Sequence, residues 1–120
     1  MKRDMELVRL LLLQEETGEA SPELSEYSTE AMIYNYQIMD DAGLIVANFT
    51  KDSSGIAVGV SVYRLTWAGH DFLDATRDSK IWKMAKEQIL KPGGSWTFSI
   101  LLEWLKQEAQ KRFLGVPPSS

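Results

Sequence analysis

Apolar residues recur at helical spacing close to the start of the chain, within residues 3–16. The apolar positions there are Met5, Leu7, Val8, Leu10, Leu11, Leu12 and Leu13. They repeat every three or four residues and cover more than one narrow stripe, which predicts a helix buried on two sides. Gly18 predicts the end of this helix. Residues 23–27, which follow a short connection, fit either a short helix or an edge strand.

A second helical pattern covers residues 29–42. Ser28 or Thr29 is suited to cap this helix, and Gly43 predicts its end. Steps of about 100° per residue place one set on the face expected to be buried: Ala31, Asn35, Ile38, Met39 and Ala42. The opposite face carries Glu30, Ile33, Gln37 and Asp40, with Tyr36 and Asp41 at its edge.

The next pattern is typical of a β-hairpin. Residues 44–50 form an apolar run suited to a strand, and residues 51–55 form a polar turn that contains Gly55. Residues 58–65 alternate valines with smaller or polar side chains, which predicts the second strand.

Three helices are predicted after the hairpin, over about 66–77, 78–91 and 97–114. Thr66 is suited to cap the first of them, where Gly69 allows close backbone packing, and Asp78 or Ser79 is suited to cap the second. The sequence Pro92-Gly93-Gly94 is the clearest break in the chain and precedes the last helix.

This order of elements predicts an α+β fold that is mostly α. Helix, short piece, helix and hairpin fit a winged helix-turn-helix core with a β-hairpin wing, and the remaining helices fit a C-terminal helical extension. The core is expected over residues 1–78, the extension of the same domain over 79–115, and a flexible tail over 116–120. In such a core the helix at 29–42 takes the third-helix position, which reads DNA in many proteins of this fold.

The composition of the chain limits which metal sites, disulfides and catalytic residues it can have. A chain of 120 residues is the usual size of one domain, and without cysteine it has no disulfide or thiolate metal site. Its single histidine, His70, has no second histidine or cysteine to pair with, so we expect a structural role early in a helix. No catalytic residue, metal or cofactor is predicted. No apolar stretch reaches the roughly 18 residues of a membrane span, which predicts a soluble cytoplasmic protein.

Charge changes the interpretation of the third helix. Between Arg9 and Lys51 the chain has no lysine or arginine but eight acidic residues. Residues 80–112 carry the opposite sign, with seven basic side chains against three acidic ones. A surface that binds phosphate normally neutralises it with several Lys or Arg side chains. The acidic third helix therefore disfavours ordinary DNA reading and favours a basic partner.

Three segments together resemble an uncharacterised "domain of unknown function" family that is common in phages, prophages and mobile elements of bacteria. They are MKRDMELVR at 1–9, YNYQIMDDAGLI at 34–45 and RLTWAGHDFLDATRDSKIWKMAKE at 64–87. The resemblance covers about residues 1–90 and implies a winged-helix-like fold, a mobile-element origin and a location in the cytoplasm of a bacterial host cell, but no mechanism. Members of the family commonly have a basic or neutral residue near position 40, where this chain has Asp40.

The first functional hypothesis is a non-enzymatic adaptor or inhibitor that binds a host or phage protein. Its contact surface is the outward face of the third helix. The candidate residues are Glu30, Ile33, Tyr36, Gln37, Asp40 and Asp41.

The alternative hypothesis is a transcription regulator that contacts DNA through the wing and the basic residues of the N-terminus. Its candidate residues are Lys2, Arg3, Arg9, Lys51 and Arg64.

The last helix is dense in apolar and aromatic residues, which fits packing within the chain but favours a homodimer interface. The candidate interface residues are Trp96, Phe98, Leu101, Leu102, Trp104 and Leu105.

Overall fold

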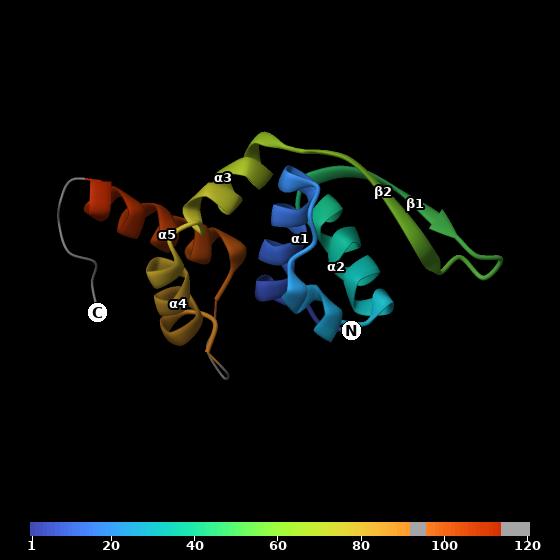
Figure 1. Cartoon of the computed structure of the whole chain (residues 1–120), viewed down its shortest axis with the longest axis horizontal. Helices are drawn as coiled ribbons and strands as arrows, with labels where there is room; N and C mark the ends of the chain where they lie inside the picture. The colour runs from blue at the N-terminus through green and yellow to red at the C-terminus, as the bar shows by residue number, and fades with distance from the viewer. Residues whose placement is uncertain (92–95, 114–120) are drawn as a thin grey trace. The chain divides into compact units, whose positions relative to one another are not determined.

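The computed structural model describes residues 1–91 and 96–113, and within these ranges the protein is an α+β fold that is mostly helical (Figure 1). The elements are α1 (Met5–Thr17), the 3-10 helix η1 (Pro22–Glu26), α2 (Thr29–Asp41), β1 (Ile45–Lys51), β2 (Ala57–Leu65), α3 (Trp67–Ala75), α4 (Ser79–Gln88) and α5 (Phe98–Phe113). The chain divides into two compact units between Leu73 and Asp74. The predicted division lies after residue 78. The segment 23–27, predicted as helix or strand, is the 3-10 helix.

The start of α1 is fixed by Asp4. Its side chain accepts a hydrogen bond from the Leu7 backbone N–H at 3.1 Å, which caps the helix. The Asp4 backbone N–H donates to the amide oxygen of Asn35 at 3.0 Å, and the Asn35 amide nitrogen donates to the Ala31 carbonyl at 2.9 Å. Asp4 therefore ties the first turn of α1 to the buried side of α2. Gly18 ends α1 with a φ of 77°, which confirms the predicted stop.

The core of the first unit is built around the apolar side of α1, which lies beside α2 (Figure 1). The buried side chains include Leu7, Leu11, Leu12, Met39, Ile45 and Phe72. The wide apolar sector of α1 is thus buried as predicted. Ser28 caps α2 by accepting the Ala31 N–H at 3.1 Å, which confirms it as one of the two predicted caps.

The hairpin of β1 and β2 is antiparallel and irregular at two places. β2 is longer than β1, and the register skips one residue of β2 at each irregularity. Val46 pairs with Arg64 and Ala47 with Val62, so Tyr63 is skipped. Thr50 pairs with Gly59 and Lys51 with Ala57, so Val58 is skipped in the same way. Such bulges re-aim side chains locally.

The junction after the hairpin packs as the sequence predicts. The Thr66 hydroxyl accepts the Gly69 backbone N–H at 3.1 Å and donates to the carbonyl of Gly43. A Cβ on Gly69 would lie 2.0 Å from the carbonyl oxygen of Leu44. Only glycine therefore fits this position without a backbone shift, because the start of α3 lies directly against the turn between α2 and β1.

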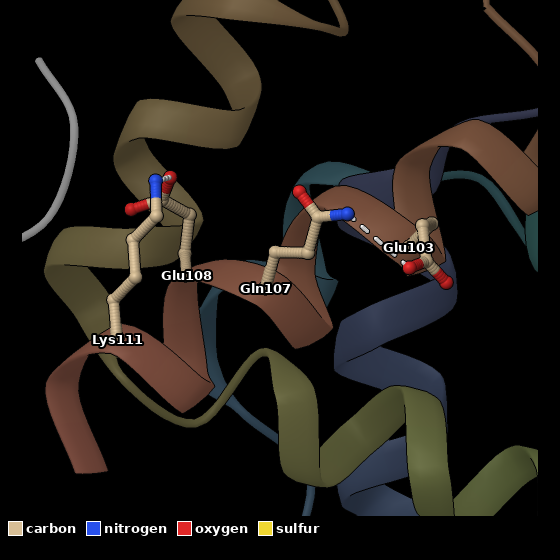
Figure 2. Close-up of polar contacts among 4 residues, drawn as sticks. All are labelled: Glu103, Gln107, Glu108 and Lys111. Atoms are coloured by element: carbon tan, nitrogen blue, oxygen red, sulfur yellow. Dashed lines mark hydrogen bonds and ion pairs between the residues drawn. The ribbon is translucent and has the colours of Figure 1, made fainter. Parts of the chain in front are cut away.

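The second unit contains α4 and α5, which contact each other. Asp78 caps α4 by accepting the N–H groups of Lys80 and Ile81 at 2.9 and 3.1 Å, which confirms it as one of the two predicted caps. On α5, Gln107 donates to Glu103 at 3.3 Å, and Lys111 pairs at 3.2 Å with Glu108, which is buried (Figure 2). The predicted break at 92–94 and the tail at 116–120 lie outside the described residues.

Among the helices described in 1–91 and 96–113, none combines the length and apolar character that a membrane span requires.

Candidate protein-binding surface

One side of α2 is open to solvent along its whole length. Glu30 and Asp41, at its two ends, are exposed, and Ile33, Tyr34 and Gln37 between them are partly exposed. The spacing of these five positions follows the helical repeat, so they form one face. We call these five residues the outward face of α2.

Tyr36 does not belong to this face, and its prediction as a contact residue is wrong. Its side chain is only 5% exposed. The phenol hydroxyl donates to a carboxylate oxygen of Glu15 at 2.7 Å and accepts from the Gln14 amide at 3.1 Å. Burial, followed by the hydrogen bond to Glu15, raises the pKa of Tyr36 well above its usual value. An ideal helical projection put Tyr36 at the edge of the outward face, but α1 packs over that edge and supplies two polar partners.

Tyr34 takes the place that the sequence interpretation gave to Tyr36. It stands four residues after Glu30 and three before Gln37, both on the outward face. That spacing was readable from the sequence, but the residue was not singled out there. Ala42, predicted on the buried face, is exposed because α2 ends at Asp41.

The two carboxylates at the end of α2 have different roles. Asp40 accepts the backbone N–H of Ala47 in β1 at 3.3 Å, so it joins α2 to the sheet. Asp41 is exposed, and no ion pair reaches it among the described residues. The last turn of α2 contains no basic residue. Because the negative end of the helix dipole disfavours carboxylates, Asp41 gains nothing from its position.

A groove of about 490 Å³ lies between the first half of α2 and the start of β2. It is lined by Met1, Thr29, Glu30, Ile33, Tyr34, Gln37, Ile56, Ala57 and Val58. Three of its lining side chains are large, apolar and mostly exposed: Met1 at 69%, Ile56 at 63% and Val58 at 53%. Val58 is one of the two bulge residues of β2. The groove therefore combines apolar walls with one carboxylate at its border.

The basic residues of the DNA-binding alternative come from the segment ahead of α1, from α1 and from the two strands of the hairpin. Lys2 and Arg3 are exposed ahead of α1, whereas Arg9 is only partly exposed and lies 4.0 Å from Glu6. Lys51 stands near the turn of the hairpin, where it pairs with Ala57 of the groove wall, and Arg64 stands at the base of the hairpin, where it pairs with Val46. Val46 lies five residues from Lys51 along β1, so the positions of Lys51 and Arg64 are about 17 Å apart at about 3.3 Å per residue.

The apolar residues of α5 are divided between interior and surface. Leu101 and Leu105 are 0% exposed, so their assignment to a dimer interface is wrong for the chain as folded. Leu102 and Trp104, like Phe98 and Trp96, are partly buried.

The open side of α5 holds a shallow hollow of about 500 Å³ lined by Ser99, Ile100, Glu103, Trp104 and Gln107. Two of these, Glu103 and Gln107, are drawn in Figure 2. Ile100 is 52% exposed. Ile100 and Trp104 therefore form the most open apolar surface of α5 among the described residues.

His70 is exposed on α3. Among the described residues, His, Asp and Glu side chains do not gather in a group of three that could hold a metal ion.

The fold and the groove define a mostly helical α+β protein whose helix and hairpin form an apolar surface bordered by a carboxylate. The chain belongs to the family described as "Hypothetical protein (DUF2513)", whose model matches residues 2–95. It is 31% identical over 116 residues to an uncharacterized protein of Haemophilus influenzae (strain ATCC 51907 / DSM 11121 / KW20 / Rd), and the match covers 92% of this chain and 93% of that protein. No solved structure matches the chain. The predicted membership of a family of unknown function is thereby confirmed.

Proposed function

We propose that this protein is a non-enzymatic adaptor or inhibitor that binds another protein through the outward face of α2 and the adjoining groove. The observation that carries the proposal is the clustering of exposed apolar side chains. Of the six large apolar side chains exposed among the described residues, three border this one groove. Apolar surface gathered in a concave site marks an interaction surface far more strongly than scattered apolar residues do.

The electrostatics favour a protein over DNA. Residues 1–73 contain twelve Asp and Glu residues against five Lys and Arg residues. On the outward face of α2, Glu30 and Asp41 would meet phosphates, and each like-charge contact opposes binding. Gln37 alone offers a side chain suited to base edges. A transcription regulator that uses Lys51 and Arg64 would also have to engage two charges at opposite ends of the hairpin.

We also propose that the first unit is a winged-helix core. The order α1, η1, α2, β1 and β2 follows the order of that core, with α2 as third helix and the hairpin as wing. In such a core the groove would lie beside the helix that reads DNA in many proteins of this fold, which supports a binding role for it. The resemblance of the sequence to a phage and prophage family supports an origin in a mobile element and a place of action in the bacterial cytoplasm.

The test is capture of partners from nuclease-treated bacterial lysate. The wild type is compared with a variant carrying Glu30→Lys and Asp41→Lys, and with a control carrying Glu19→Lys and Glu23→Lys. Both variants change the net charge equally, but Glu19 and Glu23 do not line the groove. The proposal expects a protein retained by the wild type and the control and lost from the α2 variant. Asp40 is left intact because it holds Ala47.

Direct measurement of DNA binding separates the alternative. A regulator would bind duplex DNA with an affinity that falls steeply with salt, and Lys51→Glu or Arg64→Glu would weaken it. If DNA is bound in this way and the two α2 reversals strengthen it, the protein-binding proposal is wrong.

A further inference from the structure

We infer that the groove recognises a protein segment that presents one large apolar side chain with a lysine or arginine beside it, the cation pairing with Glu30. This inference rests on the proposed function and names the chemistry of the partner. It follows from the shape, the apolar walls and the charge of a single site.

The walls of the groove are apolar on both sides, so they suit a large apolar side chain of a partner. Ile33 on α2 and Ile56 and Val58 on the hairpin line the groove from both sides. Val58 is skipped in the pairing with β1, and its side chain is 53% exposed at the border of the groove. A volume of about 490 Å³ lies within the range of pockets that hold small ligands, so the groove has room for one large apolar side chain.

Glu30 provides the negative charge that would pair with a lysine or arginine of the partner. Its side chain is exposed at the border of the groove and has no ion pair among the described residues. Lys2, next to Met1 of the groove lining, and Lys51, which pairs with Ala57 of the groove wall, are cations near the site, but neither forms an ion pair with Glu30. A cation that arrives next to a buried apolar anchor is partly desolvated, so its pairing with Glu30 is stronger than an ordinary surface ion pair. The site thus favours a partner segment that carries both a positive charge and a large apolar side chain.

Tyr34 and Gln37 complete the recognition surface. Both line the groove between Glu30 and the end of α2. A tyrosine ring supplies contact area and a hydroxyl at low entropic cost, and the glutamine amide can both donate to and accept from a peptide backbone. A short extended or helical segment therefore finds apolar, ionic and neutral polar contacts on one side of α2.

The experiment is selection from a random peptide library on the immobilised full-length protein. On the wild type, the enriched peptides should carry a Leu, Ile, Met or Phe with Lys or Arg nearby, and acidic residues should be depleted. Selection on Glu30→Lys should return Asp or Glu at the position of the cation with the apolar residue kept. This reversal of sign is a result that non-specific attraction to an acidic protein does not give.

Affinity measurements on a selected peptide localise the site. Val58→Asp should weaken binding about tenfold or more, because it puts a charge in the apolar wall. The control with Glu19→Lys and Glu23→Lys should bind within about twofold of the wild type. Circular dichroism confirms that each variant is folded, and Ile56→Ser provides a milder change of the same wall.

Three outcomes overturn the inference. The first is enrichment without a basic residue, and the second is binding that Val58→Asp and Ile56→Ser leave unchanged. The third is occupation of the groove by a second copy of the chain, seen as a concentration-dependent dimer in light scattering that Val58→Asp abolishes. In each case, lysate capture that is lost on reversal of Glu30 and Asp41 would leave the proposed function standing.

Discussion

Two helices of this protein carry apolar faces that predict interaction surfaces, α2 in the first unit and α5 in the second. On α2 the outward face is open and borders a groove with three exposed apolar side chains. On α5 two of the proposed contact residues, Leu101 and Leu105, are fully buried. Density of apolar residues along a helix therefore does not distinguish an interface from a core. Position relative to neighbouring elements does.

The difference has a physical basis. A leucine on a helix stabilises the protein by the apolar area it removes from water, whether a neighbouring helix or a partner covers it. The sequence of α5 satisfies this need within the chain, whereas the hairpin leaves Ile56 and Val58 exposed beside α2. The groove has kept apolar surface that folding did not cover. The predictions below test this contrast between the two helices, from the largest expected effect to the smallest.

Leu101→Asp should destabilise the protein by at least about 3 kcal/mol, because it removes a buried side chain and places a charge in its site. Ile100→Asp, one position away on the open side of α5, should change the free energy of unfolding by less than about 0.5 kcal/mol. Urea unfolding followed by tryptophan fluorescence measures both. Equal effects of the two variants would contradict the division of α5 into a buried and an open side.

Tyr36→Phe should lower the free energy of unfolding by about 1–2 kcal/mol, since the hydroxyl bonds both Glu15 and Gln14. Tyr34→Phe should have almost no effect on stability and should weaken partner binding instead. Thermal unfolding and peptide affinity, measured on the same two variants, test whether these neighbouring tyrosines have opposite roles.

Alkaline pH should sharpen the role of Tyr36 further. The folded state holds the phenol proton more tightly than the unfolded state, because the pKa of Tyr36 is raised from its ordinary value of 10.0. Its contribution to stability is complete below that value. As the pH rises above it, the unfolded chain ionises first, and stability falls by about 1.4 kcal/mol per pH unit. Tyr36→Phe has no phenol to ionise, so it should not show this loss of stability. The difference in the free energy of unfolding between wild type and Tyr36→Phe should therefore be smaller at pH 11 than at pH 8.

Asp41→Lys should stabilise the protein by about 0.5 kcal/mol while weakening capture of the partner. The stabilisation arises because a cation at the end of α2 interacts favourably with the helix dipole and a carboxylate does not. Chemical denaturation in low salt measures the gain in stability, and repeating it in about 1 M salt should screen that gain. Gain of stability together with full retention of the partner would show that Asp41 takes no part in binding.

Much of the local structure could be predicted from the residues themselves. Gly18 and Gly43 marked helix ends because glycine tolerates positive φ, and both have it. Asp78 marked a helix start because its side chain satisfies free N–H groups. Gly69 marked a close approach, confirmed by the 2.0 Å between a Cβ at that position and Leu44. These predictions succeeded because each depends on the chemistry of one residue and its immediate neighbours.

The site was only partly predictable. Its acidic helix, with Glu30, Ile33, Gln37 and Asp41, followed from charge and helical periodicity. The hairpin wall did not, because the meeting of Ile56 and Val58 with α2 depends on how the hairpin packs beside that helix. Asp40 was assigned to the surface, but its bond to Ala47 shows that it also belongs to the joint with β1.

By itself, the sequence determined the order of the helices and the hairpin, the acidic character of α2 and the membership of a family. These properties depend on short-range periodicity and on composition. Only the tertiary structure decided which tyrosine faces α1, which leucines of α5 are interior, and where exposed apolar side chains meet. Those properties depend on which surfaces pack together, because a side chain counts as buried only relative to the elements that cover it.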